Sequence, residues 1–219
     1  MTKDVIIFGV KDFAELAHFY LTHDSEYHVV AFTVHRNFLP EEKLFCGLPI
    51  VAFEDVEALY PPSSFSFFAP MAPNKMNQLR ERVYHEGKQK GYHFISYISS
   101  KCTNFATSIG ENCFVLEDNT IQPFVQIGNN VVMWSGNHIG HHSVIGNHVM
   151  FTSHVVLSGH CIVGDYCLFG VNATIRDGLT IGNGTFVAMG TSVIKSTPEW
   201  SFVKGTFGEI SGVDSRKMI

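Results

Sequence analysis

The sequence predicts a small α/β domain with a parallel, Rossmann-like sheet in residues 1–100, followed by a parallel β-helix in residues 101–198 and a C-terminal tail in residues 199–219. Two observations predict this division. Short apolar runs alternate with amphipathic stretches in the first hundred residues. From Ile109 onward, large apolar residues recur at every sixth position, which is typical of a β-helix built from hexapeptides.

The first hundred residues predict three strands that alternate with helices. The segments "VIIFG", "HVVAFTV" and "SFSFFAP" are short and apolar, as buried parallel strands are. The segment "KDFAELAHFYLTH" has apolar residues three and four apart, and "NKMNQLRERVYHEGKQKG" ends near Gly91, so we expect both to be helices. Strands separated by helices form parallel sheets with crossover connections, which indicates a doubly wound domain.

The carboxyl ends of these strands are the expected ligand site of the α/β domain, because ligands of such sheets bind there. The dinucleotide fingerprint GxGxxG is incomplete, since "FGVKDFAE" keeps only its first glycine, so a nucleotide smaller than NAD is favoured. A sheet edge without any ligand is the alternative. The residues expected to contact the substrate are Gly9, Lys11, Thr33, His35, Arg36, Met71 and Lys75.

The period of six continues from Ile109 to Val193 without an insertion, and every position in it is apolar. In each hexapeptide, glycine often follows the apolar residue directly, and the fourth residue after the apolar residue is mostly small or branched. In a parallel β-helix each six residues form one short face, with the large residue inside and the small one at the corner. Three faces close a coil of 18 residues, so we expect about five coils in which residues 18 apart stack directly.

Composition limits the partners of the protein. A net charge of −5 with only 15 Lys plus Arg gives no basic surface for nucleic acid, and the N-terminal apolar run is too short for a signal or a membrane span. We therefore expect a cytoplasmic protein. The five cysteines lack CxxC spacing, and Cys113, Cys161 and Cys167 fall at small inward positions, which favours reduced, buried thiols. The flat outer faces of a three-sided prism favour a homotrimer.

The unbroken hexapeptides after a small α/β domain, together with "SGNHIGHHSVIG" and "FGVNATI", resemble the sugar acyltransferases of the left-handed β-helix class. The nearest group within that class acetylates nucleotide-linked amino sugars and sialic acids. The resemblance implies that acetyl-coenzyme A (acetyl-CoA) lies along the β-helix between subunits, that the N-terminal domain holds the nucleotide, and that a histidine accepts a proton from the attacking group. That histidine corresponds to His141.

Two departures from the group's pattern concern the site. A carboxylate commonly follows the histidine in that group, whereas this sequence has His142. The resemblance therefore does not identify the residue that orients His141. The closing "VxGxPA" stretch of the group is changed to "VKGTFG" at residues 203–208. This change weakens any assignment of contacts at the far end of the coenzyme.

The coil spacing places Gly159 directly after His141 in the stack, 18 residues later. A bare glycine amide could stabilise the oxyanion that develops on a thioester, although a glycine needed only for the turn is the alternative. Imidazole, with a reference pKa of about 6.5, can accept the amine's proton near neutral pH, so we expect direct transfer without an acyl-enzyme. The other expected contacts are Asn137 and His138 for the sugar, and Asn172 and Lys195, with Gly159, for the coenzyme.

Six of the twelve histidines lie in residues 134–160. Those at 142, 148, 154 and 160 recur every six residues, so they visit successive faces and are not expected to converge. Only His142 and His160 stack on one face, and two imidazoles are fewer than the three or four protein ligands of a usual zinc site. We therefore expect no metal, and polar turn residues are the alternative explanation of the series.

The sequence thus predicts an N-acetyltransferase that transfers the acetyl group of acetyl-CoA to a nucleotide-linked amino sugar in lipopolysaccharide or glycan biosynthesis. A 4-amino-4,6-dideoxyhexose is the expected sugar, and the preference for an amine comes from the resemblance. An O-acetyltransferase of sialic acid or a related sugar is the nearest alternative. A trimeric zinc lyase resembling carbonic anhydrase, whose zinc is shared across subunits by three histidines, and a non-catalytic trimeric scaffold are the others.

Overall fold

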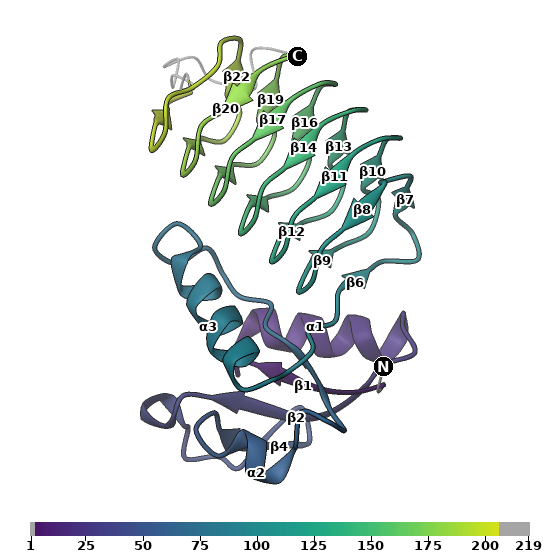
Figure 1. Cartoon of the computed structure of the whole chain (residues 1–219), viewed down its shortest axis with the longest axis vertical. Coiled ribbons are helices and arrows are strands. Elements are labelled where there is room, and N and C mark those ends of the chain that lie inside the picture. The colour runs from purple at the N-terminus through teal and green to yellow at the C-terminus, as the bar shows by residue number, and fades with distance from the viewer. Residues whose placement is uncertain (1–2, 206–219) are drawn as a thin grey trace, which may run out of the picture.

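The computed structural model describes residues 3–205 and shows an α/β domain packed against one face of a β-helix (Figure 1). The three predicted strands and two predicted helices of the α/β domain are confirmed. The sheet has the strand order β3-β4-β2-β1-β5, and all its pairs except β3 with β4 are parallel. In chain order, the elements of the α/β domain are β1 (Asp4–Phe8), α1 (Asp12–His23), β2 (His28–Val34), the 3₁₀ helix η1 (Arg36–Phe38), β3 (Leu44–Phe45), β4 (Leu48–Ala52), α2 (Val56–Leu59), β5 (Ser66–Phe68) and α3 (Gln78–Gln89).

The hairpin of β3 and β4 is an addition to the predicted sheet. Its two-residue turn consists of Cys46 and Gly47, whose φ angles of 50° and 78° are both left-handed, as in the type I′ turns of tight hairpins. Asn-Gly and Asp-Gly pairs are the usual sequence signal for this turn, and Cys-Gly is not one of them. The turn therefore has no recognisable signature in the sequence.

The β-helix confirms the six-residue period, because two-residue strands follow one another at that interval from β8 to β22 and each ends on the predicted apolar residue. Strands 18 residues apart pair in parallel and form the three faces of a left-handed β-helix. The face that contacts the α/β domain, called the docked face, comprises β6 (Tyr97–Ile98), β9 (Phe114–Val115), β12 (Val132–Met133), β15 (Met150–Phe151), β18 (Leu168–Phe169), β21 (Phe186–Val187) and β23 (Phe202–Val203).

The two remaining faces continue the prism. The second face comprises β7 (Thr103–Asn104), β10 (Thr120–Ile121), β13 (His138–Ile139), β16 (Val156–Leu157), β19 (Thr174–Ile175) and β22 (Ser192–Val193). The third face comprises β8 (Ser108–Ile109), β11 (Gln126–Ile127), β14 (Val144–Ile145), β17 (Ile162–Val163) and β20 (Thr180–Ile181). Strand pairing of the β-helix thus begins at β6, before residue 101, and ends at β23, beyond residue 198; residues 206–219 of the expected tail lie outside the described residues.

From residue 112 to residue 190, a left-handed backbone residue recurs at every turn of the β-helix and explains the histidine series. Glycine adopts this conformation freely, and Asn, Asp and His adopt it more readily than other residues do. The φ angles of all four histidines in the series are between 58° and 60°, so they are turn residues. The full set is Asn112, Asp118, Phe124, Asn130, Gly136, His142, His148, His154, His160, Tyr166, Asn172, Gly178, Gly184 and Gly190.

The interior of the prism is filled as the hexapeptides predict. The apolar residue of each strand points inward, and Phe151 and Phe169 stack there in successive coils with ring centroids 4.6 Å apart. Cys113, Cys161 and Cys167 are fully buried free thiols, which confirms the interpretation of those cysteines. The coils stack so closely that several of the recurring glycines have no space for a side chain. A Cβ added at these positions would collide with the backbone of the next coil.

The α/β domain is fixed to the docked face by an apolar interface. Val132 and Met150 point outward from that face and pack in one cluster with α1 residues such as Leu21. Trp134 belongs to the same interface, where its ring meets the Phe13 ring edge-on at a centroid distance of 5.5 Å. The second and third faces receive no contact of this kind from the α/β domain (Figure 1). Within residues 3–205, no helix has the length and hydropathy that a membrane span requires.

Asp24, at the end of α1, connects the α/β domain to the first coil and should make stability depend on acid. Hydrogen bonding by the Ser100 side chain and by the Tyr97 hydroxyl at 2.6 Å, together with the Ser100 amide at 2.9 Å, lowers the pKa of Asp24 to about 2. A lowered native pKa stabilises the fold above the unfolded pKa of about 3.9, and this contribution is lost as the pH falls from 4 toward 2. Asp24→Asn should therefore have a lower Tm than the wild type at pH 7, with a difference that shrinks below pH 4. A difference that is constant from pH 7 to pH 2.5 would contradict this origin.

Candidate active site

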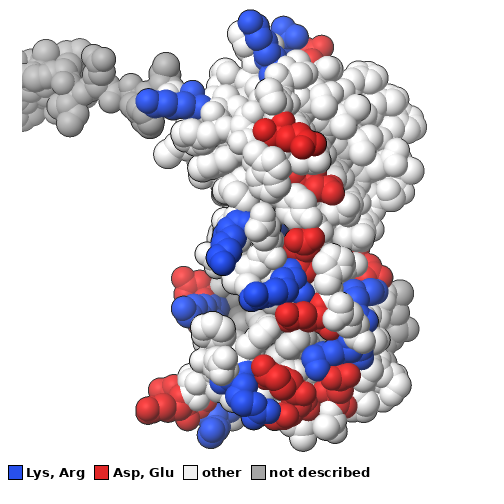
Figure 2. Space-filling model, turned by 60° about the vertical axis from the view of Figure 1, so that its left-hand side comes forward, with Lys and Arg blue, Asp and Glu red and all other residues white. Residues whose placement is uncertain are grey.

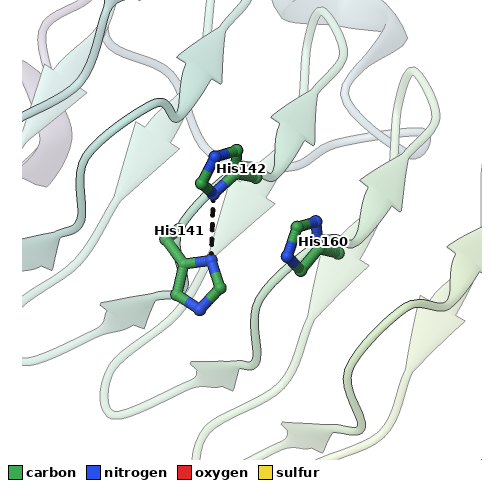
Figure 3. Close-up of side chains that lie close together, drawn as sticks. All are labelled: His141, His142 and His160. Carbon is green, nitrogen blue, oxygen red and sulfur yellow. Dashed lines mark hydrogen bonds between the residues drawn. The ribbon is translucent and has the colours of Figure 1, made fainter.

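Three imidazoles meet at the corner between the second and third faces, called here the histidine corner (Figure 3). His141 and His142 come from the turn between β13 and β14, and His160 comes from the equivalent turn one coil later. The Nδ1 atoms of His141 and His142 are 3.0 Å apart, which is a hydrogen-bond distance. The rings of His142 and His160 stack with centroids 4.9 Å apart at an angle of 15°. All three side chains are exposed.

The turn conformation produces this grouping. His142 and His160 both have φ of 58°, so their side chains leave the prism in the same direction in successive coils. Phe124 occupies the same position one coil earlier and packs on His142 at a centroid distance of 4.6 Å. The expectation that no more than two imidazoles would converge was wrong, because His141, next to the turn residue, directs its ring toward the same pair.

Gly159, one coil after His141, lies directly next to the His141 imidazole. A Cβ on Gly159 would lie 2.8 Å from Cε1 and 3.0 Å from Nε2 of His141, so the imidazole occupies the space of the missing side chain. The φ angle of Gly159 is outside the left-handed region, so the turn itself does not require glycine here. Among residues 3–205, no hydrogen bond from the Gly159 amide to protein is seen, which leaves this N–H available to a ligand.

The coils around the histidine corner carry no formal charge. Residues 119–164 contain no Lys, Arg, Asp or Glu. No carboxylate of these coils can therefore orient His141, and the neighbouring imidazole of His142 is the group at hydrogen-bond distance. The backbone N–H of His141 donates to Gln122 Oε1 at 2.9 Å, which fixes the start of the turn.

A cleft of about 740 Å³ opens at the carboxyl ends of β1, β2 and β5, where the sequence places the nucleotide. Four of the seven expected residues line it: Gly9, Lys11, His35 and Met71. Lys11 is the residue before the first turn of α1, so the free backbone N–H groups of that helix begin at the cleft. Arg82 of α3 also lines the cleft. The sequence did not predict this contact, because the residue pattern of a helix does not show which of its exposed arginines faces the edge of a neighbouring sheet.

The other expected substrate contacts lie elsewhere. Thr33 is fully buried and its hydroxyl donates to the Val51 carbonyl, because its side chain faces the neighbouring strand. Arg36 forms an ion pair with Asp55 at 2.7 Å outside the cleft, and Lys75 does not line it. Asn137 is buried inside the coil, where its amide group bonds Asn119 and the Val155 amide, so it cannot reach a sugar. The expectations for Thr33, Arg36, Lys75 and Asn137 are corrected accordingly.

The remaining predicted contacts lie on the outside of the β-helix. His138 is half-buried on the second face, one turn before the histidine corner. Asn172 is an exposed turn residue with φ of 60°, and Lys195 is exposed just after β22.

His35 is oriented at the cleft by stacking on Phe53 at 5.2 Å and by the Glu86 carboxylate 2.9 Å from its Nε2 atom.

The cleft and the histidine corner are separate within one chain. All residues that line the cleft lie between Phe8 and Val83, so no β-helix residue contributes to it. The α/β domain covers the docked face, whereas the histidine corner joins the two other faces.

Comparisons with known proteins identify the repeats. The family "Bacterial transferase hexapeptide (six repeats)" matches residues 106–141, and "Hexapeptide repeat of succinyl-transferase" matches residues 161–195. No curated protein sequence matches the chain significantly.

Three solved structures are similar over most of both chains. The acetyltransferase domain of PglB from Neisseria gonorrhoeae FA1090 superposes with a TM-score of 0.80 at 16% identity, covering 92% of this chain and 96% of that one. PerB from Caulobacter crescentus, in complex with CoA and GDP-perosamine, gives 0.79 at 21% identity, covering 91% and 92%. WeeI from Acinetobacter baumannii AYE gives 0.76 at 20% identity, covering 90% and 94%. The chain therefore carries bacterial-transferase hexapeptide repeats and shares the complete two-part fold of these proteins.

Proposed function

We propose that the protein is an acetyl-CoA-dependent N-acetyltransferase that acts on a nucleotide-linked amino sugar, with a 4-amino-4,6-dideoxyhexose as the expected sugar. The observation that carries the proposal is the exposed His141 imidazole in the space that a Gly159 side chain would fill, next to a glycine whose amide makes no hydrogen bond within residues 3–205. The cleft at the sheet edge supports a nucleotide. The complex of PerB with CoA and GDP-perosamine, and that of the N. gonorrhoeae domain with acetyl-CoA, support the two substrates.

In the proposed reaction, the sugar amine attacks the thioester carbonyl carbon and gives a proton to Nε2 of His141. The Gly159 N–H stabilises the oxyanion of the tetrahedral intermediate. Collapse of this intermediate breaks the carbon–sulfur bond, and the departing thiolate takes the proton from His141, so the products are the acetamido sugar and free CoA. No acyl-enzyme forms.

His142 is the positioning residue in this scheme. For Nε2 of His141 to accept a proton, the imidazole must carry its hydrogen on Nδ1, and that N–H then donates to Nδ1 of His142 at 3.0 Å. His142 is held in turn by stacking between Phe124 and His160. The His142 imidazole thus takes the place of the carboxylate that commonly follows the histidine in the enzymes that this sequence resembles.

A homotrimer completes the proposed site. The third face and the histidine corner expose apolar side chains, including Phe124, Val144 and Ile162. Figure 2 shows one face of the molecule on which charged residues are dense over the α/β domain and sparse over the β-helix. Uncharged, partly apolar faces favour packing between copies, and a closed three-fold ring brings the cleft of one copy to the histidine corner of the next.

The proposal is tested by incubating the purified protein with acetyl-CoA and a panel of nucleotide amino sugars, their hydroxyl analogues and sialic acid. Free thiol is followed during the reaction, and the product is examined by mass spectrometry for an added acetyl group. We expect thiol release only with an amino sugar. Release only with sialic acid would identify an O-acetyltransferase, and no release with any acceptor would refute a transferase.

Lys11→Met should raise the KM for the nucleotide sugar about tenfold, because a charge-assisted bond to phosphate is worth roughly 1.4 kcal/mol or more. The KM for acetyl-CoA should not change, since Lys11 lines the cleft and the coenzyme is expected along the β-helix. Lys75→Met is the matched control, because Lys75 is an exposed lysine of the same domain that does not line the cleft. An equal rise in KM for both variants would contradict the assignment of the cleft.

Gly159→Ala should lower kcat about tenfold to hundredfold, because the added methyl group displaces the His141 imidazole and misplacement of about 1 Å can cost that much. The backbone of Gly159 accepts alanine, so the Tm should change little. In a background that already carries His141→Asn, the same substitution should have a much smaller effect. Equal effects in both backgrounds would show that Gly159 does not act together with His141.

A further inference from the structure

The histidine corner has the composition of a metal site. His141, His142 and His160 each offer a ring nitrogen within 4.8 Å of the other two. Imidazole nitrogens bind zinc at about 2.0–2.1 Å, which places nitrogens of a tetrahedral site about 3.3 Å apart. The Nδ1 atoms of His141 and His142 are already 3.0 Å apart, and rotation of exposed side chains can close the remaining gap (Figure 3). We infer that these three residues of one protomer form an inhibitory zinc site.

The backbone holds two of the ligands in place before any ion binds. His142 and His160 occupy the same turn position of successive coils, with identical φ angles of 58° and stacked rings. The amide of His160 also donates to the His141 carbonyl at 2.9 Å, which ties the two turns together. A preorganised group of ligands loses less conformational entropy on binding than three independent surface histidines do.

The chemistry of the corner favours zinc over harder cations. Neutral imidazoles suit zinc and copper, whereas calcium and magnesium need carboxylate or carbonyl oxygens, which residues 119–164 offer only from backbone and amide groups. The same stretch contains no Lys or Arg to repel a divalent ion. Three protein ligands leave one tetrahedral position for water, as in open zinc sites.

One other group within residues 3–205 has ligands close enough for a metal: Glu81, His85 and His148. Its hydrogen bonds disfavour zinc. The Ala69 backbone fixes the Asn112 amide, which donates to Asn130 Oδ1 at 2.7 Å, so Asn130 Nδ2 must donate to Nδ1 of His148 at 2.8 Å. The hydrogen of His148 is therefore on Nε2, its remaining nitrogen. Burial also lowers the pKa of His148 to about 4, so it is a neutral structural imidazole.

Zinc at the histidine corner would occupy the one in-plane lone pair of the His141 imidazole, whose other nitrogen carries the ring hydrogen. It would therefore prevent that residue from accepting the amine's proton. This inhibition rests on the proposed function, whereas the binding of zinc does not.

The binding test is calorimetric titration of ZnCl₂ into the full-length protein in a non-chelating buffer. His160→Asn should weaken zinc binding by at least about tenfold, because it removes one of three ligands while asparagine keeps the left-handed turn. His154→Asn, at the equivalent turn position on another corner, and His85→Gln, from the other group, should bind zinc as the wild type does. Anomalous scattering at the zinc edge should show the ion between the three rings.

The activity test follows thiol release with increasing ZnCl₂. Zinc should inhibit the wild type and His154→Asn, and chelation should restore turnover. His160→Asn should keep its own zinc-free turnover, whatever its value, at zinc concentrations that inhibit the wild type. Absence of zinc binding, or equal binding by wild type and His160→Asn, would overturn the site. Zinc bound at the corner with unchanged transfer, or with CO₂ hydration, would overturn its inhibitory role. If no acceptor sugar supports transfer, the calorimetric and scattering results still decide the site.

Discussion

Replacing His141 with asparagine should lower kcat by about 10²–10⁴-fold, the usual contribution of a positioned general base. Asparagine is similar in size to the imidazole near the backbone but cannot accept the amine's proton. Fold and oligomeric state should not change, because the side chain is exposed at a corner of the prism. The deficit should shrink as the pH rises, because hydroxide can then take the proton that His141 accepts from the attacking amine at neutral pH.

His154→Asn is the matched control for this experiment. His154 is also an exposed turn histidine, with φ of 59°, but it lies on the corner between the docked and second faces. Its variant should retain wild-type turnover. Near-normal turnover of His141→Asn, or an equal loss in the two variants, would remove His141 from the mechanism.

Replacing Arg80 with alanine should lower the free energy of unfolding by about 3–5 kcal/mol, because carbonyls lose their donor at roughly 1–3 kcal/mol each and a cavity forms. Arg80 is completely buried, and its guanidinium links α3 to the β-helix by donating to the carbonyls of Met71, His148 and Val149. Burial lowers the pKa of Arg80 to about 9, so the group is still cationic at neutral pH. The alanine variant leaves the carbonyls of Met71 and His148 without this donor, and it also creates a cavity.

Arg82→Ala provides the comparison for Arg80. Arg82 lies two residues later on α3, but it is exposed and its 3.8 Å ion pair with Glu86 should contribute little to stability. Chemical unfolding of the purified variants should separate them clearly. Equal stability of Arg80→Ala and Arg82→Ala would show that the buried guanidinium does not hold the two parts of the chain together.

The β-helix could be predicted almost completely from the sequence because each hexapeptide meets the same packing demands. The large residue must fill the prism, and the small residue must fit the corner, so residues such as Ile139 and Cys161 can be assigned one by one. The hairpin turn at Cys46 could not be predicted, because its left-handed conformation is imposed by the pairing of β3 with β4 rather than by a favourable residue type.

The candidate site could be predicted only in part, for a similar reason. Periodicity places Gly159 over His141, and the His141 imidazole lies in the space that a Gly159 side chain would fill. Periodicity does not fix the direction of side chains next to a turn, and this direction is what brings His141 to His142 and His160. Ligands bind at the carboxyl ends of parallel strands, and this rule correctly places Gly9 and Lys11 at the cleft. The rule cannot show that the Thr33 side chain, also at a strand end, points toward the adjacent strand and away from a ligand.

The central claim is that a catalytic site combines the cleft of one protomer with the histidine corner of another. It is tested most directly with mixed oligomers of His141→Asn and Asn74→Trp, since Asn74 is an exposed cleft residue and tryptophan there would fill the cleft. The two variants carry different affinity tags, and oligomers that contain both are purified and assayed for thiol release. Each variant alone should be nearly inactive. Mixed trimers should recover about one third of wild-type turnover, because one of their three interfaces pairs an intact cleft with an intact His141. Mixed oligomers no more active than either parent would contradict a site shared between protomers.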